Sequence, residues 1–108
     1  MDKCQSPSTL KHNAPQKSVE DLFARALASH RAGNLEEAVE LYTIVLDIDN
    51  RSVATLDNLC VALKDLKRLP EALACVDRAI AIKPDYAQAY SNRSAILLGL
   101  QQIEDAII

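Results

Sequence analysis

Apolar residues recur along most of the chain at intervals of three and four positions, with polar residues between them. Leu35, Ala38, Val39, Tyr42 and Leu46 illustrate this spacing, which places apolar side chains on one face of an α-helix. Short polar segments separate the stretches that carry the pattern, so we predict an all-α chain. The predicted helices span residues 19–32, 35–48, 53–66, 69–82, 87–100 and 103 onward.

The pattern also repeats at a fixed offset of 34 residues, as the positions of Ala38, Ala72 and Ala106 show. Further sets in the same register are Leu35, Leu69 and Ile103; Glu37, Glu71 and Asp105; and Leu22, Leu56 and Tyr90. A repeat of this length that holds two helices is typical of arrays of helical hairpins. We predict a first unit at 19–52, a second at 53–86 and an incomplete third at 87–108.

Residues near the predicted helix ends have the chemistry that begins or ends helices. Ser18 and Asn34 each precede an acidic residue by three positions, which is the pattern of a capping box. Gly33 suits the left-handed backbone of a turn between two helices. Pro70 falls where a first helical turn tolerates proline, and Pro84 follows a predicted helix end.

The run Gly-Asn-Leu-Glu-Glu-Ala at 33–38, followed by Tyr42 and Leu46, resembles the tetratricopeptide repeat. Lys67 and Gln101 replace the turn glycine in the later units. The resemblance implies an α-solenoid, a right-handed superhelix of antiparallel helix hairpins with two complete repeats and part of a third. It also implies a concave groove, lined by the first helix of each pair, that binds a peptide segment of a partner protein.

The resemblance also suggests which residues line the groove. We expect the peptide-binding positions to be Phe23, Leu27, Arg31, Asp57, Asn58, Val61, Lys64, Gln88 and Asn92. Other residues expected on the same faces are Glu20, His30, Asp65, Ser91 and Ala95. These positions combine charged groups with an apolar strip.

The string Tyr-Ser-Asn-Arg-Ser-Ala at 90–95 resembles the middle repeat of a subgroup that clamps a C-terminal carboxylate with Lys, Asn and Arg side chains. If Asn92 is the middle asparagine, Asp57 and Val61 stand where the subgroup has lysine and asparagine. If Asn58 takes that place, the expected basic residues are missing from the third unit. Neither register completes the clamp.

Asn58 and Asn92 fit a second subgroup better, the SPINDLY-like and O-linked N-acetylglucosamine transferase arrays. There, a ladder of asparagines binds the backbone of a peptide, since an amide donates and accepts hydrogen bonds at once. Ala24 interrupts the ladder in the first unit. The alternative for each asparagine is that its amide bridges neighbouring helices.

Composition argues against other classes of partner. A net charge of −3 does not favour nucleic acid, which is bound by clustered Lys and Arg. No apolar run reaches the length of a membrane span. Residues 1–18 form a polar segment, which we expect to be a disordered tail. Three cysteines without paired spacing favour a reducing compartment, so we expect a cytoplasmic protein.

Catalytic and cofactor sites are not predicted either. Gly33 and Gly99 are the two glycines, too few for a phosphate-cradling loop. His30 has no second ligand at metal spacing, and we expect it at the solvent or the groove edge. Cys60 and Cys75 lie at apolar helix positions without a nearby base. We therefore expect a chain without cofactor, metal or catalytic activity.

The leading hypothesis is a protein-protein interaction module that binds a peptide segment in the groove. One alternative is the N-terminal, substrate-recruiting part of a larger glycosyltransferase or sulfotransferase. Another is a scaffold that associates with itself through an apolar C-terminal edge. That edge is expected to expose Ile96, Leu97, Leu98, Leu100, Ile103, Ile107 and Ile108, and it suggests a truncated piece of a longer array.

Overall fold

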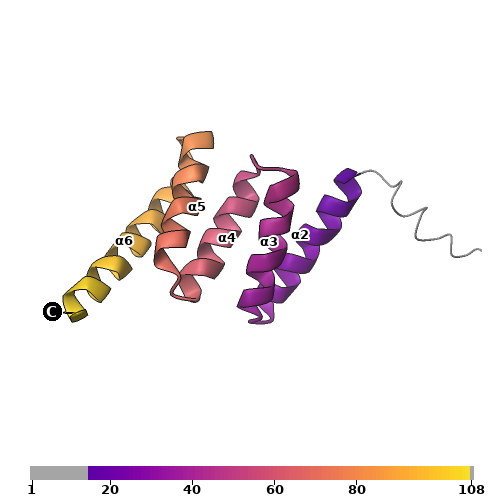
Figure 1. The fold of residues 1–108 in the computed structure, drawn as a ribbon. Helices are drawn as coiled ribbons and strands as arrows, with labels where there is room; N and C mark the ends of the chain where they lie inside the picture. Colours follow the sequence, from indigo (N-terminus) through magenta and orange to yellow (C-terminus); the bar gives the residue numbers. More distant parts are fainter. Residues whose placement is uncertain (1–14, 108) are drawn as a thin grey trace, which may run out of the picture.

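The computed structural model describes residues 15–107, and this range is helical apart from short turns. Its helices are α2 (Pro15–Arg31), α3 (Leu35–Ile48), α4 (Val53–Asp65), α5 (Leu69–Ile82) and α6 (Ala87–Ile107). Each helix packs on the next one along the chain, and α4 also contacts α6. Figure 1 shows the resulting row of hairpins, α2 with α3 and α4 with α5, followed by α6. The predicted all-α solenoid is confirmed.

The turns inside the two hairpins have the same geometry. Gly33 has a φ of 87° and Lys67 a φ of 66°, both in the left-handed region. At the second turn the Arg68 amide donates to the Leu63 carbonyl at 2.9 Å. At the first turn the Asn34 amide donates to the Ser29 carbonyl, also at 2.9 Å. This bond closes a Schellman motif. Lys67 thus adopts a backbone conformation that normally favours glycine.

The helix starts differ from the predicted caps. Of the predicted tail, residues 15–18 belong to α2 because Pro15 is tolerated in a first turn; residues 1–14 lie outside the described range. Ser18 is therefore inside the helix and is not its cap. Asn34 holds the cap position of α3, but its side chain makes no capping bond. At α4 the Ser52 side chain accepts a hydrogen bond from the Thr55 amide at 3.2 Å. This helix cap was not among the predicted ones.

The predicted break between residues 100 and 103 is wrong, because α6 runs from Ala87 to Ile107 without interruption. Gln101 occupies the position equivalent to Gly33 and Lys67 but stays helical. In the other two units a long second helix packs back on the first and stabilises the turn. Glutamine is a good helix former, whereas glycine at this position favours the end of a helix, so Gln101 is compatible with a helix that continues.

Small side chains allow the helices to approach closely. Ala38, Ala72 and Ala79 are fully buried, as expected of residues between the helices of a pair. Tyr42 and Ile96 are also fully buried. The expectation that Ile96 lies on an exposed edge is therefore wrong, because α6 packs this side of itself against the preceding hairpin.

The other described members of the predicted apolar edge have different environments. Leu97, Leu98 and Ile103 are exposed, with 57% of the Leu98 surface accessible. Leu100 instead packs against the core. The side chains of Ile107 and Ile108 are not among those that the structure describes. Within the described range, no helix combines the length and apolar character that crossing a membrane requires.

Candidate functional site

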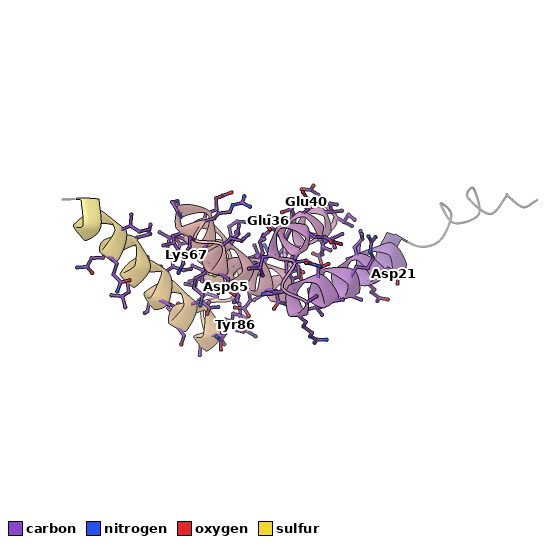
Figure 2. The ribbon with its side chains drawn as sticks, turned by 90° about the horizontal axis from the view of Figure 1, so that it is seen from below. Asp21, Glu36, Glu40, Asp65, Lys67 and Tyr86 are labelled. Atoms are coloured by element: carbon purple, nitrogen blue, oxygen red, sulfur yellow. The ribbon has the colours of Figure 1, made fainter. Side chains whose placement is uncertain are left out.

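The first helices of the repeats, α2, α4 and α6, carry all the residues predicted for the groove. We call the surface that they form the first-helix face. Figure 2 shows Glu36 and Glu40 of α3 on one side of the molecule and Tyr86, just before α6, on the other. The first-helix face has two junctions, α2 with α4 and α4 with α6, and they differ in chemistry.

The junction between α4 and α6 is closed by a hydrogen bond between side chains. The Asn92 Nδ2 group donates to Asp57 Oδ1 at 2.7 Å, and Gln88 Nε2 donates to Asn92 Oδ1 at 3.5 Å. Only 5% of Asn92 is exposed. The Asn92 amide is therefore engaged within the protein, which favours the interpretation of this asparagine as a bridge between helices.

Burial shifts the acid-base equilibrium of this pair. Desolvation raises the pKa of the Asp57 carboxyl, and polar contacts with Tyr86 and Asn92 oppose that rise without cancelling it. The pKa of Tyr86 is also raised, first by burial and then by the neighbouring Asp57 charge. Removing a carboxylate from water disfavours its ionised form. The donors Tyr86 and Asn92 stabilise that ionised form, but only in part.

The junction between α2 and α4 instead contains an apolar cavity of about 310 Å³. We call it the α2/α4 cavity. Its described lining residues come from α2, from the end of α3 and from the start of α4, and they are Val19, Glu20, Phe23, Ala24, Leu27, Val45, Asp49, Ser52, Ala54 and Thr55. Of the predicted groove residues, Phe23, Leu27 and Glu20 therefore meet at one site.

The repeat register explains why the two junctions differ. Phe23 is equivalent to Asp57, and Asn58 is equivalent to Asn92, each at an offset of 34 residues. Phe23 offers no acceptor for an amide. Asn58 is half-buried and, among the described residues, its side chain forms no hydrogen bond that corresponds to the one between Asn92 and Asp57.

An aromatic cluster packs beneath the α2/α4 cavity. The Phe23 and Tyr42 rings lie 6.0 Å apart at an angle of 56°, and His30 Nδ1 lies 3.1 Å from the Tyr42 hydroxyl. His30 is thus half-buried and faces α3, which corrects its predicted place at the solvent or groove edge. Burial raises the pKa of Tyr42, although the Arg31 charge lowers it in part.

The remaining predicted positions are spread along the face. Val61 is half-buried on α4, while Arg31 and Gln88 are exposed. Lys64 lines a second cavity of about 300 Å³ between α4, the start of α5 and α6. Asp65 and Ala95 line the same cavity, together with Lys67, Leu69, Leu98, Gly99 and Gln102.

The sequence reasoning missed the contribution of α3 and of the following loop to the site. Val45, Asp49 and Ser52 line the α2/α4 cavity, yet the resemblance assigns the groove to first helices alone. A usable signal was available, because the loop that joins two units necessarily runs beside the first helices of both. Asp49 and Ser52 belong to that loop.

The two described cysteines do not have the environment of reactive thiols. Cys60 and Cys75 are free and buried, and burial raises the pKa of the Cys60 thiol to about 12, whereas a nucleophile needs its thiolate. The pKa of Cys75 is raised as well, chiefly by burial. Among the residues described, no three His, Cys, Asp or Glu side chains are grouped as metal ligands.

Comparison with known proteins places the chain among helical repeats. The family model described as "Tetratricopeptide repeat" matches residues 29–96. RNA polymerase II-associated protein 3 of Xenopus laevis is 34% identical over 76 residues, which are 70% of this chain and 12% of that protein. The Hsp70-Hsp90 organizing protein of Triticum aestivum is 31% identical over 82 residues, 76% of this chain and 14% of the relative.

Solved structures agree with this assignment. The first TPR domain of Spaghetti (RPAP3), bound to the HSP90 peptide SRMEEVD, superposes with a TM-score of 0.74 at 28% identity, over 83% of this chain and 73% of that one. The first TPR domain of human RPAP3 gives a TM-score of 0.72 at 28% identity, over 82% and 69%. The closer resemblance to O-linked N-acetylglucosamine transferase arrays is not specifically supported by these matches.

Proposed function

Because the chain belongs to the tetratricopeptide repeat family, we propose that it is an interaction module that binds a peptide segment of a partner protein on the first-helix face. The observation that carries the proposal is the α2/α4 cavity, an apolar concavity of about 310 Å³ of the kind that anchors ligands. The similar Spaghetti domain, which was solved with a bound HSP90 peptide, supports the same type of ligand.

The contribution of the asparagines is narrower than a complete ladder. Asn92 is bonded to Asp57, whereas Asn58 lies beside the α2/α4 cavity, one helical turn after its lining residue Ala54. We propose that Asn58 alone donates to and accepts from the backbone of the bound peptide. One such hydrogen bond contributes about 0.5–1.5 kcal/mol, so its loss corresponds to about a two- to tenfold weaker complex.

The wider setting is also proposed. The chain spans 12% of the length of the first curated relatives that it matches, so its whole-protein role is an inference. We propose a binding chain without catalytic activity or affinity for nucleic acid, in the cytoplasm, where the free thiols of Cys60 and Cys75 would persist. A role in recruiting substrates to a glycosyltransferase or sulfotransferase remains a prediction.

A second candidate function is self-association through α6. Leu97, Leu98 and Ile103 are exposed on that helix, and apolar side chains on an uncovered helix face often mark an interface. Sedimentation velocity over a wide range of concentrations tests this candidate. A mass that rises with concentration in the wild-type chain, and not in Leu98→Lys, would support it; a constant monomer mass would contradict it.

The main proposal is tested by selecting peptides from a random display library on the full chain and mapping the selected peptides by NMR. Amide shift changes are expected in α2, α4 and α6, and Asn58→Ala should weaken binding about two- to tenfold. Asn34→Ala is the matched control. The Asn34 side chain makes no capping hydrogen bond, and this residue lies in a turn, outside α2, α4 and α6. Failure to select any peptide, or binding confined to α3 and α5, would reject peptide binding on this face.

A further inference from the structure

We propose that the α2/α4 cavity selects a peptide that presents a large apolar side chain next to lysine or arginine, and that it discriminates against acidic tails. This inference rests on the proposed function, since it names the ligand class of the same face. It follows from three observations: the volume and lining of the cavity, the sign of the charges around it, and the position of Asn58.

The size and walls of the cavity fit one large apolar side chain. Its volume of about 310 Å³ is roughly twice the ~150 Å³ of an engineered apolar cavity that holds benzene. Phe23 and Leu27 of α2 and Val45 of α3 line this space, with Ala24 and Ala54 completing the apolar walls. An aliphatic or aromatic side chain placed here would be removed from water on several sides, which is the main source of affinity at such sites.

The neutral polar groups in the lining are already satisfied. Ser52 Oγ accepts from the Thr55 amide at 3.2 Å, and the two hydroxyls lie 2.8 Å apart. Thr55 is nearly fully buried. These groups therefore have little capacity left for a ligand, and they do not make the cavity select a neutral polar side chain.

The charged groups in the described lining are both acidic. Glu20 on α2 and Asp49, which follows α3, both line the cavity, and both are exposed. No Lys or Arg is among the described lining residues. A cation adjacent to the anchoring side chain would thus meet negative charge at the cavity, and such complementarity chiefly sets specificity and association rate.

The same charges oppose an acidic tail. The peptide bound to the similar Spaghetti domain, SRMEEVD, contains two glutamates and a C-terminal aspartate. In this chain a carboxylate-rich segment would pass Glu20 and Asp49, and then Asp57 at the next junction. Juxtaposed like charges cost affinity, so the α2/α4 cavity disfavours a ligand of that composition.

Asn58 makes a peptide the natural ligand rather than a small amphiphile. It lies one turn after Ala54 on α4, so the two residues share a helix face. Its half-buried amide can donate to and accept from one extended peptide unit. In the complex, the cavity would hold the apolar side chain of the peptide, and Glu20 and Asp49 would attract the neighbouring lysine or arginine. Asn58 would bind the peptide backbone.

The test uses fluorescence anisotropy with the full chain and three labelled peptides. They are acetyl-Gly-Ser-Arg-Phe-Lys-Ser-Gly-amide, an acidic analogue with Glu-Phe-Glu at its centre, and an analogue with Arg-Ala-Lys. The first peptide should bind at least about tenfold more tightly than either analogue, which corresponds to 1.4 kcal/mol. Its affinity should also fall as salt is added.

Two variants test the cavity and its charge separately, each with a matched control. Ala24→Leu fills the cavity and Glu20→Lys reverses its charge; both positions are exposed, so the fold should persist, as circular dichroism will verify. Each should weaken binding of the Phe peptide about tenfold. Ala74→Leu on α5 and Asp21→Lys on α2 place a leucine and a lysine at exposed positions outside the described lining, and they should leave binding unchanged.

Each contrary outcome overturns a defined part of the inference. Equal binding of the three peptides, or equal effects of Ala24→Leu and Ala74→Leu, would reject the cavity as the anchor site. Preference for the acidic peptide, or library selection of acidic peptides that map to the first-helix face, would reject the charge rule while the proposed function stands. A concentration-dependent mass that Ala24→Leu abolishes would assign the cavity to a second copy of the chain.

Discussion

The two junctions on the first-helix face have the same backbone register but opposite chemistry. At the α4/α6 junction, Asn92 donates to Asp57 at 2.7 Å. At the α2/α4 junction, the equivalent residues are Asn58 and Phe23, and an apolar cavity of about 310 Å³ lies there instead. A hydrogen bond joins one pair of helices, while the other pair leaves a recess.

This difference shows how a repeat protein can vary function without changing its fold. Stability in such arrays is approximately a sum of terms for each unit and each interface. A substitution at the position of Phe23 or Asp57 therefore alters one junction and leaves the helical register intact. Binding chemistry can change between neighbouring units of one short chain.

The largest expected effect concerns the aromatic cluster beneath the apolar junction. Tyr42 is fully buried and contacts both Phe23 and His30, so Tyr42→Ala should lower the free energy of unfolding by about 3–5 kcal/mol in urea titrations. Val76 is its equivalent in the second unit and is also buried. Val76→Ala should lower the free energy of unfolding by less than Tyr42→Ala does. Equal losses in the two variants would mean that the aromatic cluster adds no stability to the first unit.

The polar junction predicts the next effect. Asn92→Ala removes the donor to a half-buried carboxyl and should destabilise the chain by about 1–3 kcal/mol. Asn58→Ala serves as the control at the other junction and should change stability by less than about 0.5 kcal/mol. A double-mutant cycle with Asp57→Ala measures the coupling directly. Additive losses would show that the bond contributes nothing.

The two hairpin turns extend the comparison to the backbone. Lys67 has a φ of 66° where the first turn has Gly33, and a side chain in this conformation costs about 1–2 kcal/mol. Lys67→Gly should therefore raise the free energy of unfolding by about 1 kcal/mol. Gly33→Ala should lower it by a similar amount. A destabilised Lys67→Gly variant would indicate that the lysine side chain contributes a compensating contact.

The smallest expected effect is the contribution of Asp57, in the polar junction, to the dependence of stability on pH. Burial raises the pKa of the Asp57 carboxyl in the folded state above the 3.8 of the free side chain. Between pH 3.8 and the raised pKa, the folded state therefore binds more protons than the unfolded state. Its contribution to stability is therefore present below pH 3.8 and is lost as pH rises through the raised pKa.

Asp57→Asn tests this dependence while keeping an oxygen that accepts from Asn92. The difference in unfolding free energy between wild type and variant should shift in favour of the variant as pH increases through this window. Urea titrations at several acidic pH values give that difference and cancel the contributions of other carboxyls. A difference that is constant with pH would contradict the raised pKa.

Most of the fold was predictable because local chemistry repeats. The 34-residue offset placed Ala38 and Ala72, both fully buried, and Gly33 marked a turn whose φ is indeed positive. The continuous α6 was not predictable from the repeat. Lys67 forms the turn without being glycine, so the identity of Gln101 does not decide between a turn and a continued helix.

The site was less predictable because it depends on pairs of residues distant in sequence. Asn58 and Asn92 occupy equivalent positions, and only the identity of the residue opposite each one, Phe23 or Asp57, decides whether the amide is engaged. The spacing of one residue type does not carry that information. The contribution of Asp49 to the cavity likewise depends on the path of a loop between two units.

The buried thiols give the second hairpin a built-in reporter of its own opening. Cys60 on α4 and Cys75 on α5 are shielded, and the pKa of Cys60 is about 12, so alkylating reagents can reach them only in molecules in which that hairpin has transiently separated. Once Cys4 is replaced by serine, the alkylation rate would report the local opening equilibrium under conditions where the hairpin recloses faster than the reagent reacts. Stability could then be followed unit by unit, in water and without denaturant.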